Sequence, residues 1–292
     1  MESIIQTIHK TAYPQIDAAA PSRLQQGKTV LITGGAGGIG FAIARAFAIA
    51  NAATIIILSR CDDRLSTAVA RLKAEVPSFA GEVMTFRCDI LHPEQIASVW
   101  VALSGRRVDV LILNAAYMGE SQTILQHGWR QVWEQYEVNV RGNLTLVDFF
   151  LRQGMEARKK FIVSISSDAI NNYAVMAGQR PYAATKASWT CLLQHLASEF
   201  SVEEVQLINV HPGGVYTETI SQMMPKGVYE WDSDTLPGNF AVWAATDEAS
   251  FLHGRYCWAG WDVEELKAAL SNDGRLESQE LLKVGIMGMR TE

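Results

Sequence analysis

The chain has 292 residues, of which 48% are hydrophobic and 19% are charged, and its mean hydropathy is +0.04. These values exclude a disordered or collagen-like chain, and they provide enough apolar surface for one large core. The 25 basic and 31 acidic residues give a net charge of −6, with no cluster of Lys and Arg, so a nucleic-acid partner is not expected.

The cysteines and the N-terminus bear on metal binding and location. Cys61, Cys88, Cys191 and Cys257 lack the spacing of a metal site or a disulfide framework, so we expect free, buried thiols and no bound metal. The N-terminal sequence MESIIQTIHK lacks the pattern of a signal peptide. No apolar run reaches the roughly 18 residues that a membrane-spanning helix needs. A cytoplasmic protein without a membrane partner is therefore expected.

From Lys28 onward, short runs rich in β-branched residues alternate with longer helical patterns. Strands are expected at KTVLIT, ATIIILS, EVMTFRC, VDVLILN, KFIVSIS and VQLINVH. Helices are expected at 38 to about 50, at 62–75, from 93, at 129–160 and at 182–200. Because the strands are continuously apolar, they indicate a parallel sheet with both faces covered. The predicted fold class is α/β, a doubly wound parallel sheet in a single domain.

This alternation has limits at both ends of the chain. Residues 1–27 form an N-terminal arm, interpreted as a peripheral segment that packs on the domain, and residues 273–292 form a C-terminal tail. Within 28–272, a segment with Met, Trp and Pro at about 215–238 has the character of a lid over a ligand. A last strand is expected at RYCW. Asp262, followed by Glu265, predicts a capping box that opens a final helix.

A glycine-rich turn, GGAGGIG at 34–40, joins the first strand to the first helix. Side chains there would keep the backbone from approaching a pyrophosphate, and the helix N-terminus offers free N–H groups and a positive dipole. This placement predicts that 28–272 is a dinucleotide-binding catalytic domain. The alternative is a flexible loop that happens to be rich in glycine.

The sequence TGGAGGIG at 33–40 resembles the glycine motif of the short-chain dehydrogenase/reductase family, and ordered motifs extend the resemblance over roughly residues 28 to 261. The resemblance implies a Rossmann-like fold and a nicotinamide cofactor. Its pyrophosphate would lie on Gly34, Gly38, Ile39 and Gly40. The arm sequence YPQID and the ending YCWAGWD resemble a subset of the family that is common in fungi and often linked to secondary metabolism.

The end of the second expected strand bears on the choice between NAD and NADP. It reads Leu58-Ser59-Arg60, with no carboxylate before Asp62. A carboxylate there would bind the ribose 2′-hydroxyl, whereas an arginine would pair with a 2′-phosphate. The resemblance therefore implies contacts from Ser59 and Arg60 and a preference for NADP(H) over NAD(H), although Gly37 stands where relatives carry a second basic residue. An ordinary surface arginine is the alternative for Arg60.

Three later strand ends carry further motifs of the family: CDI at 88–90, LNAA at 113–116 and HPGGVYT at 211–217. The resemblance implies that Asp89 binds adenine, although capping the next helix is an alternative role. It also implies that the Val215 backbone and the Thr217 hydroxyl hold the nicotinamide carboxamide. In LNAA an alanine replaces the family's usual final glycine. The contacts that these motifs imply are Asp89, Ile90, Asn114, Ala115, Pro212, Gly213, Val215 and Thr217.

Tyr182 and Lys186 lie four residues apart, which puts both on one face of a helix. A phenol has a pKa of about 10, so it needs a nearby cation to act as an acid or base at neutral pH. The resemblance implies that both residues also contact the cofactor, that Ser167 orients the substrate and that Asn139 orders a water molecule. Ser166 is the alternative to Ser167, and a helix-packing amide is the alternative for Asn139.

Two further polar residues lie beside these motifs. Asp168 follows the predicted catalytic serine, where its carboxylate would either favour a polar substrate or point to solvent. His211 precedes Pro212 and is interpreted as a hydrogen-bonding residue at a strand end rather than as a catalyst.

Together these inferences predict an NADP(H)-dependent oxidoreductase that transfers a hydride between nicotinamide and a ketone or secondary alcohol. The Met and aromatic residues of the lid favour a hydrophobic cyclic or secondary-metabolite substrate, and ordinary packing between the lid and the core is the alternative interpretation of these residues. Two alternatives keep the fold: a non-redox acid/base enzyme, such as an epimerase, dehydratase or cyclase, and a cofactor-sensing binding protein without turnover. In relatives the helices that correspond to those from Trp129 and Tyr182 pair across a two-fold axis, so a homodimer or homotetramer is expected.

Overall fold

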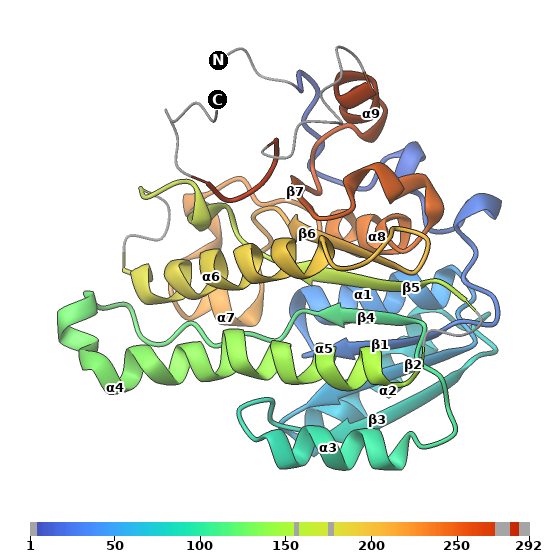
Figure 1. Cartoon of the computed structure of the whole chain (residues 1–292), viewed down its shortest axis with the longest axis horizontal. Coiled ribbons are helices and arrows are strands. Elements are labelled where there is room, and N and C mark those ends of the chain that lie inside the picture. The colour runs from blue at the N-terminus through green and yellow to red at the C-terminus, as the bar shows by residue number, and fades with distance from the viewer. Residues whose placement is uncertain (1–4, 155–157, 175–177, 272–280, 286–292) are drawn as a thin grey trace.

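The computed structural model describes residues 5–154, 158–174, 178–271 and 281–285. Seven strands form one parallel sheet in the order β3-β2-β1-β4-β5-β6-β7 (Figure 1). The strands are β1 (Thr29–Thr33), β2 (Thr54–Ser59), β3 (Glu82–Arg87), β4 (Val110–Leu113), β5 (Lys160–Ile165), β6 (Val205–His211) and β7 (Arg255–Trp258). The strand order reverses direction between β1 and β4, so the predicted Rossmann-like, doubly wound α/β fold in a single domain is confirmed.

Helices cover both faces of the sheet. The helices are α1 (Gly38–Ile49), α2 (Asp62–Glu75), α3 (Pro93–Ala102), α4 (Ile124–Tyr136), α5 (Asn143–Arg152), α6 (Arg180–Ala197), α7 (Glu218–Ser221), α8 (Thr235–Ala244) and α9 (Val263–Ser271). One core holds α1, α2, α8 and α9, and the other holds α3, α5 and α6. In β1, Val30 and Ile32 face the first core and Leu31 the second, which explains why the strands are apolar throughout.

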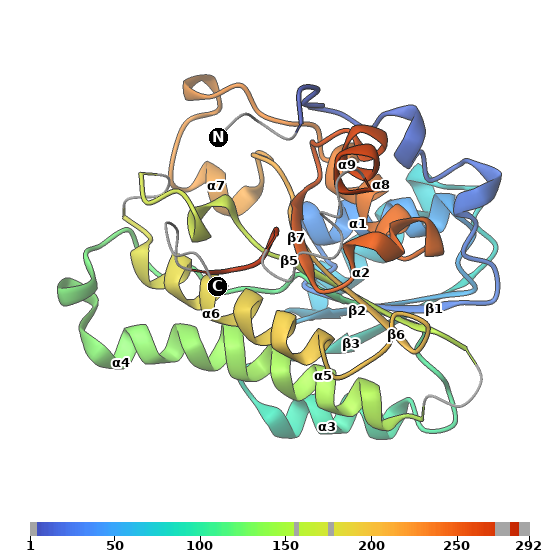
Figure 2. The ribbon, with the colours of Figure 1, turned by 45° about the horizontal axis from the view of Figure 1, so that its top comes forward.

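The helix expected at 129–160 begins where it was predicted and ends sooner. Gly128, with φ of +67° and ψ of +163°, is not helical and breaks α4, so that the continuous helix starts at Trp129. Thr123 and Gln126 form a capping box that starts the short turn of α4 before this break, which was not predicted. A π-helical segment, Glu137–Gly142, joins α4 to α5. Gly154, with φ of +86°, follows the end of α5. Figure 2 shows α5 and the part of α4 after its bend as one long rod alongside α6.

The N-terminal arm packs along the C-terminal part of the chain. Ile8 pairs with Trp261 in an antiparallel bridge, and the His9 N–H donates to the Gly260 carbonyl at 2.7 Å. Farther along the arm, Ile16 is fully buried in the core that holds α1 and α8. The arm is therefore joined to the core by both backbone pairing and apolar burial.

The capping box predicted from Asp262 and Glu265 forms only in part. Asp262 Oδ1 accepts a hydrogen bond from the Glu265 N–H at 3.0 Å, as predicted. The Glu265 carboxylate, however, accepts from the N–H groups of Gln6 and Thr7 at 2.9 and 3.1 Å. The Glu265 carboxylate thus binds two backbone N–H groups of the arm instead of the Asp262 N–H, which it would bind in a complete capping box.

The C-terminal tail expected at 273–292 lies largely outside the described residues. Its described part, 281–285, runs beside β7, where the Leu282 carbonyl accepts from the Tyr256 N–H at 2.8 Å. Across the described ranges, no helix is both long and apolar enough to cross a membrane. In that same part of the chain, no group of acidic, His or Cys side chains is arranged to hold a metal ion.

Candidate active site and cofactor cleft

The glycine turn leaves β1 at the edge where the carboxyl ends of the parallel strands meet. Gly34 and Gly38 have φ values of +63° and +51°, a backbone region that favours glycine. A Cβ on Gly40 would overlap the Gly34 carbonyl oxygen and lie 2.6 Å from Asn114 Nδ2. The turn is therefore packed too closely for a side chain at Gly40, and it brings bare backbone to the N-terminus of α1, where Ile39 follows Gly38.

Asn114 binds the glycine turn itself. Its Nδ2 donates to the carbonyl oxygens of Thr33 and Gly34, at 2.9 and 3.3 Å. The backbone N–H groups of Asn114 and Ala115 donate to Thr33 Oγ1 at 2.9 and 3.0 Å. Because both amide protons of Asn114 are used in this way, any influence of its side chain on a cofactor passes through the position of the turn.

One hollow of about 450 Å³ lies against the glycine turn. It is lined by Gly37 and Gly38 on one side and by residues 215–217 on another. Thr217 Oγ1 accepts from the Ile220 N–H at 3.3 Å and so caps α7. The structure brings the turn and the segment predicted to bind the carboxamide to the same cavity, although they are far apart in the sequence.

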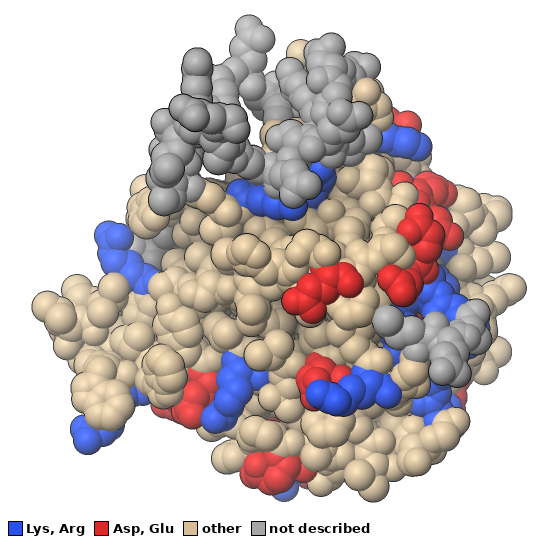
Figure 3. All heavy atoms as spheres, in the orientation of Figure 1, with Lys and Arg blue, Asp and Glu red and all other residues tan. Residues whose placement is uncertain are grey.

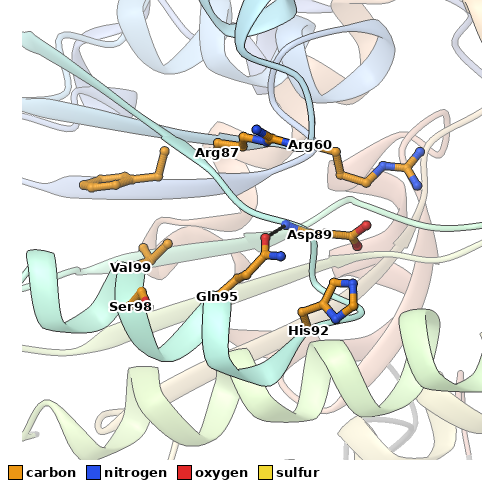
Figure 4. A pocket seen from close by; sticks show the side chains of 8 residues that line it. Arg60, Arg87, Asp89, His92, Gln95, Ser98 and Val99 are labelled. Atoms are coloured by element: carbon orange, nitrogen blue, oxygen red, sulfur yellow. Dashed lines mark hydrogen bonds between the residues drawn. The ribbon is translucent and has the colours of Figure 1, made fainter.

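A second hollow, of about 550 Å³, lies at the ends of β2 and β3. Arg60 and Arg87 line it together with Asp89 and His92 (Figure 4). Within the described residues, no ion pair forms with Arg60, whereas Arg87 Nη1 lies 3.7 Å from Asp62 Oδ2. The predicted adenine-binding carboxylate and the predicted phosphate-binding arginine thus border one cavity.

Arg87 is a residue that the sequence analysis did not select. It pairs in register with Ser59, because β3 runs parallel to β2. Its position at the end of a strand, two residues before Asp89, is the signal that could have identified it.

Asp89 also has a local structural role. Its Oδ1 accepts from the Leu91 N–H at 3.0 Å, and its own N–H donates to Gln95 Oε1 at 2.9 Å. These bonds shape the turn before α3. Asp89 therefore has a structural role similar to the helix capping that was the alternative to adenine binding. Ile90, by contrast, is buried in the core that holds α3, α5 and α6.

The predicted catalytic pair lies on the buried face of α6. Tyr182 and Lys186 are 9% and 2% exposed, and Lys186 Nζ is 5.7 Å from the centre of the Tyr182 ring. Lys186 Nζ donates to the Ile165 carbonyl at 2.6 Å. Burial lowers the pKa of Lys186 to about 8 and raises the pKa of Tyr182 above its ordinary value.

The two candidate serines after β5 have different partners. Ser166 Oγ pairs with Thr190 Oγ1 of α6 at 2.8 Å, inside the core. Ser167 Oγ accepts from the Ala169 N–H at 3.2 Å, and its hydroxyl proton has no protein partner within the described part of the chain. The Tyr256 hydroxyl donates to the Ser167 carbonyl at 3.2 Å. Of the two, Ser167 keeps a donor available for a ligand.

Asn139 lies in the π-helical segment and is fully buried. Its Oδ1 accepts from the Tyr117 N–H at 2.8 Å, and its Nδ2 donates to the Tyr117 carbonyl at 2.8 Å and to Thr185 Oγ1 at 2.9 Å. The side chain therefore joins the loop after β4 to the helix that carries Tyr182 and Lys186. These bonds are the packing that the alternative interpretation of Asn139 expects, and the water-ordering role stays a prediction.

His211 and Asp168 are neighbours at the ends of β6 and β5. His211 Nδ1 accepts from the Asp168 N–H at 3.0 Å, and its ring packs edge-on against Trp258. Burial lowers the pKa of His211 to about 4, so the ring is neutral at neutral pH. Partial burial raises the pKa of the Asp168 carboxyl, whose side chain reaches Asn172 Nδ2 only at 3.5 Å.

The lid carries an aromatic cluster over an exposed segment. The Trp231 ring lies 5.1 Å from the Tyr216 ring and 5.0 Å from the Tyr229 ring, measured between ring centres. Met223 and Met224, which lie between Tyr216 and Tyr229 in the sequence, are exposed. The lid thus offers flexible and flat apolar side chains, some of which are free of the core.

The sequence matches the family described as short chain dehydrogenase over residues 28–226. It is 35% identical to a short chain dehydrogenase/reductase, nsrO, of Aspergillus novofumigatus, over 90% of this chain and 89% of the relative. It is 36% identical to a short chain dehydrogenase/reductase of Claviceps purpurea, over 85% of this chain and 84% of the relative. The chain is therefore an oxidoreductase of the short-chain dehydrogenase/reductase family, and the resemblance to fungal members is confirmed.

Solved structures of the family share the fold. An L-sorbose reductase from Gluconobacter frateurii, in complex with NADPH and L-sorbose, has a TM-score of 0.72 at 22% identity, over 81% of this chain and 96% of that one. A 7α-hydroxysteroid dehydrogenase in complex with NADH has a TM-score of 0.69 at 21% identity, over 85% of this chain and 98% of that one. At these identities the likeness concerns the fold alone.

Proposed function

We propose that this protein is an NADP(H)-dependent oxidoreductase that interconverts a ketone and a secondary alcohol. The observation that carries the proposal is the 2.6 Å hydrogen bond from Lys186 Nζ to the Ile165 carbonyl. It holds the helix with Tyr182 and Lys186 against the strand end that leads to Ser167. An acid, a cation and a hydroxyl donor are thereby available around one substrate oxygen.

The residues around the glycine turn fit a dinucleotide, because the turn is packed too tightly for a side chain at Gly40 and brings bare backbone to the N-terminus of α1. When bound, the nicotinamide would supply or accept the hydride. The residues proposed to form the cofactor site, of which Asn114 acts through the position of the turn, are Gly34, Gly38, Ile39, Gly40, Ser59, Arg60, Asp89, Ile90, Asn114, Ala115, Tyr182, Lys186, Pro212, Gly213, Val215 and Thr217.

The proton chemistry follows from the burial of the pair on α6. In reduction, the Tyr182 phenol gives its proton to the substrate oxygen while the Ser167 hydroxyl donates a hydrogen bond to that oxygen. The ammonium of Lys186 stabilises the phenolate that remains, since the two side chains share one buried face. In the oxidation direction the same groups act in reverse. Asn139 supports the helix through Thr185.

Preference for NADP(H) over NAD(H) is supported by the two arginines at the second hollow. Arg60 and Arg87 both line it, and a 2′-phosphate is a dianion that pairs with guanidinium groups. The test is a fluorescence titration of the purified protein with NADPH and with NADH. Tighter binding of NADPH is expected. Tighter binding of NADH would contradict the role of Arg60, and binding of neither would reject the proposed activity.

A hydrophobic cyclic substrate, of the kind found in secondary metabolism, is supported by the aromatic cluster and the methionines of the lid. The test is a screen of cyclic ketones that follows NADPH consumption and product together. One equivalent of NADPH consumed for each product formed is expected. Product without NADPH consumption would favour an epimerase, dehydratase or cyclase instead.

A homodimer or homotetramer is supported by the apolar surface of α4. Leu125, Trp129 and Trp133 are 92%, 71% and 60% exposed. Figure 3 shows that the end of the molecule formed by α4, on the left, is mostly uncharged, while charges of both signs are scattered elsewhere on that face. Light scattering at micromolar concentration tests the assembly, and a monomer would contradict it.

We also propose the division into an arm at 1–27, a catalytic domain at 28–272 with a lid at about 215–238, and a tail at 273–292, in a protein that works in the cytoplasm. The described cysteines are free, which suits a reducing compartment, but only Cys88 and Cys257 are buried as expected, whereas Cys61 is exposed. Limited proteolysis tests the division, with cleavage expected first in the exposed lid. Imaging of a tagged chain in a fungal cell tests the location.

A further inference from the structure

Asp232 makes two hydrogen bonds to Gly214, which lies far from it in the sequence. Its Oδ2 accepts from the Gly214 N–H at 2.7 Å, and its own N–H donates to the Gly214 carbonyl at 2.8 Å. Val215 and Asp232 form an isolated parallel bridge. Both polar backbone groups of Gly214 are therefore held by one residue.

Gly213 shows how closely the carboxylate approaches this segment. Its φ is +88°, and a Cβ there would lie 2.5 Å from Asp232 Oδ2. Glycine visits this backbone region without steric cost, and it also visits many others. Without a partner, the two successive glycines would leave the segment before Val215 free to move. The contact with Asp232 selects one of the available conformations.

The N-terminal arm holds the chain on the other side of Asp232. The Ser233 N–H donates to the Lys10 carbonyl at 2.7 Å, and the Ala12 N–H donates to Thr235 Oγ1 at 3.3 Å. The arm is in turn joined to the core by the bridge between Ile8 and Trp261. Asp232 is thus attached to a supported segment, although the part of the lid that precedes it, 221–230, is exposed.

We propose that Asp232 is a positioning residue, which fixes the backbone of residues 213–215 so that it can hold the nicotinamide end of the cofactor. This inference rests on the proposed function, in which Val215 and Thr217 bind the carboxamide. A carboxylate suits the role because hydrogen bonds to a charged acceptor are stronger than those between neutral groups. The 2′-phosphate end of the cofactor, at Arg60, lies at a different set of strands and does not depend on this contact.

The experiment compares Asp232→Ala, Asp232→Asn and the unaltered chain, with Asp247→Ala as the matched control. Asp247 is an exposed carboxylate that pairs with Lys159 and lies outside the proposed site. Each protein is titrated with NADPH and with adenosine 2′,5′-bisphosphate, which carries the 2′-phosphate but no nicotinamide. The second ligand also reports whether a variant has folded.

The loss of one charge-assisted hydrogen bond is expected to weaken NADPH binding about tenfold in Asp232→Ala. Binding of adenosine 2′,5′-bisphosphate should not change. Asp232→Asn should lose less NADPH affinity than Asp232→Ala, because its amide oxygen can still accept from the Gly214 N–H although the charge is gone. Asp247→Ala should behave as the unaltered chain.

Other outcomes overturn the inference. Unchanged NADPH affinity in Asp232→Ala would show that the contact does not position the segment. Equal loss for both ligands would show a general structural role, and equal weakening in Asp232→Asn and Asp232→Ala would show that charge, rather than the hydrogen bond, matters. If the unaltered chain binds neither NADPH nor NADH, it is the proposed function that fails.

Discussion

The ammonium of Lys186 donates a hydrogen bond of 2.6 Å to the carbonyl oxygen of Ile165, the last residue of β5. This bond crosses from α6 to the sheet in a fully buried environment, where no water competes for either group. It keeps the lysine close to the strand end while its neighbour on the helix face, Tyr182, approaches from the same side. The proposed acid/base pair is therefore held by the core rather than by exposed loops.

Tyr182→Phe removes the phenolic proton and keeps the ring that packs on α6. We expect turnover to fall by about 10²- to 10⁴-fold, the usual contribution of a positioned acid or base, with NADPH affinity retained. Steady-state rates and a fluorescence titration measure the two effects. Tyr173→Phe, at a residue that is 82% exposed, is the matched control. Normal turnover in the Tyr182 variant would refute the assigned role.

Gly40→Ala should destabilise the protein, because the new Cβ would overlap the Gly34 carbonyl in the tightest part of the turn. Overpacking of this kind costs about 1–3 kcal/mol of unfolding free energy. Gly37→Ala is the control, since its Cβ would meet no atom within 4 Å and its φ of −166° is open to any residue. Urea unfolding measures both variants. Equal stabilities would show that the turn is not tightly packed at Gly40.

Arg60→Ala should weaken NADPH binding about tenfold and leave NADH binding unchanged, because only NADPH carries the phosphate that a guanidinium would bind. Arg152→Ala removes an exposed arginine that pairs with Asp148 on α5, and it serves as the control. Titrations of each protein with both cofactors provide the measurement. If the variant loses affinity for NADPH and for NADH equally, Arg60 does not bind the 2′-phosphate.

The neutral state of His211 predicts a loss of stability in mild acid. Its pKa falls from 6.5 to about 4 on burial, so the unfolded chain binds a proton in this range and the folded chain does not. The free energy of unfolding is therefore unaffected by the titration of His211 above pH 6.5. It decreases as the pH falls from 6.5 to about 4, by up to about 3 kcal/mol.

His211→Gln provides the comparison for that measurement, because a glutamine oxygen can accept from the Asp168 N–H but does not titrate. We expect its unfolding free energy, measured by urea at several pH values, to change less between pH 6.5 and 4 than that of the unaltered chain. Parallel curves for the two proteins would show that His211 does not contribute to the acid sensitivity.

The strands, the order of the motifs and the glycine turn were predictable because their signals are local. Continuous apolar runs such as ATIIILS specify a strand buried on both faces, and the glycines before α1 specify a turn that side chains cannot form. The spacing of Tyr182 and Lys186 likewise places them on one helix face without any knowledge of the rest of the chain. The helix start at Trp129 was likewise predictable, whereas the short turn of α4 before Gly128 was missed because its capping box lies before the apolar periodicity begins.

The tertiary structure alone decided which distant groups meet. Ser166 bonds to Thr190 in the core while Ser167 keeps its hydroxyl proton, a distinction that two adjacent serines do not reveal in the sequence. The pairing of Asp232 with Gly214 likewise depends on how the lid returns to the sheet and on the arm that supports it. Periodicity and turn chemistry act over a few residues, and they determine the elements. The partners of a buried polar group depend on packing between segments far apart in the chain. These partners are therefore determined only by the tertiary structure.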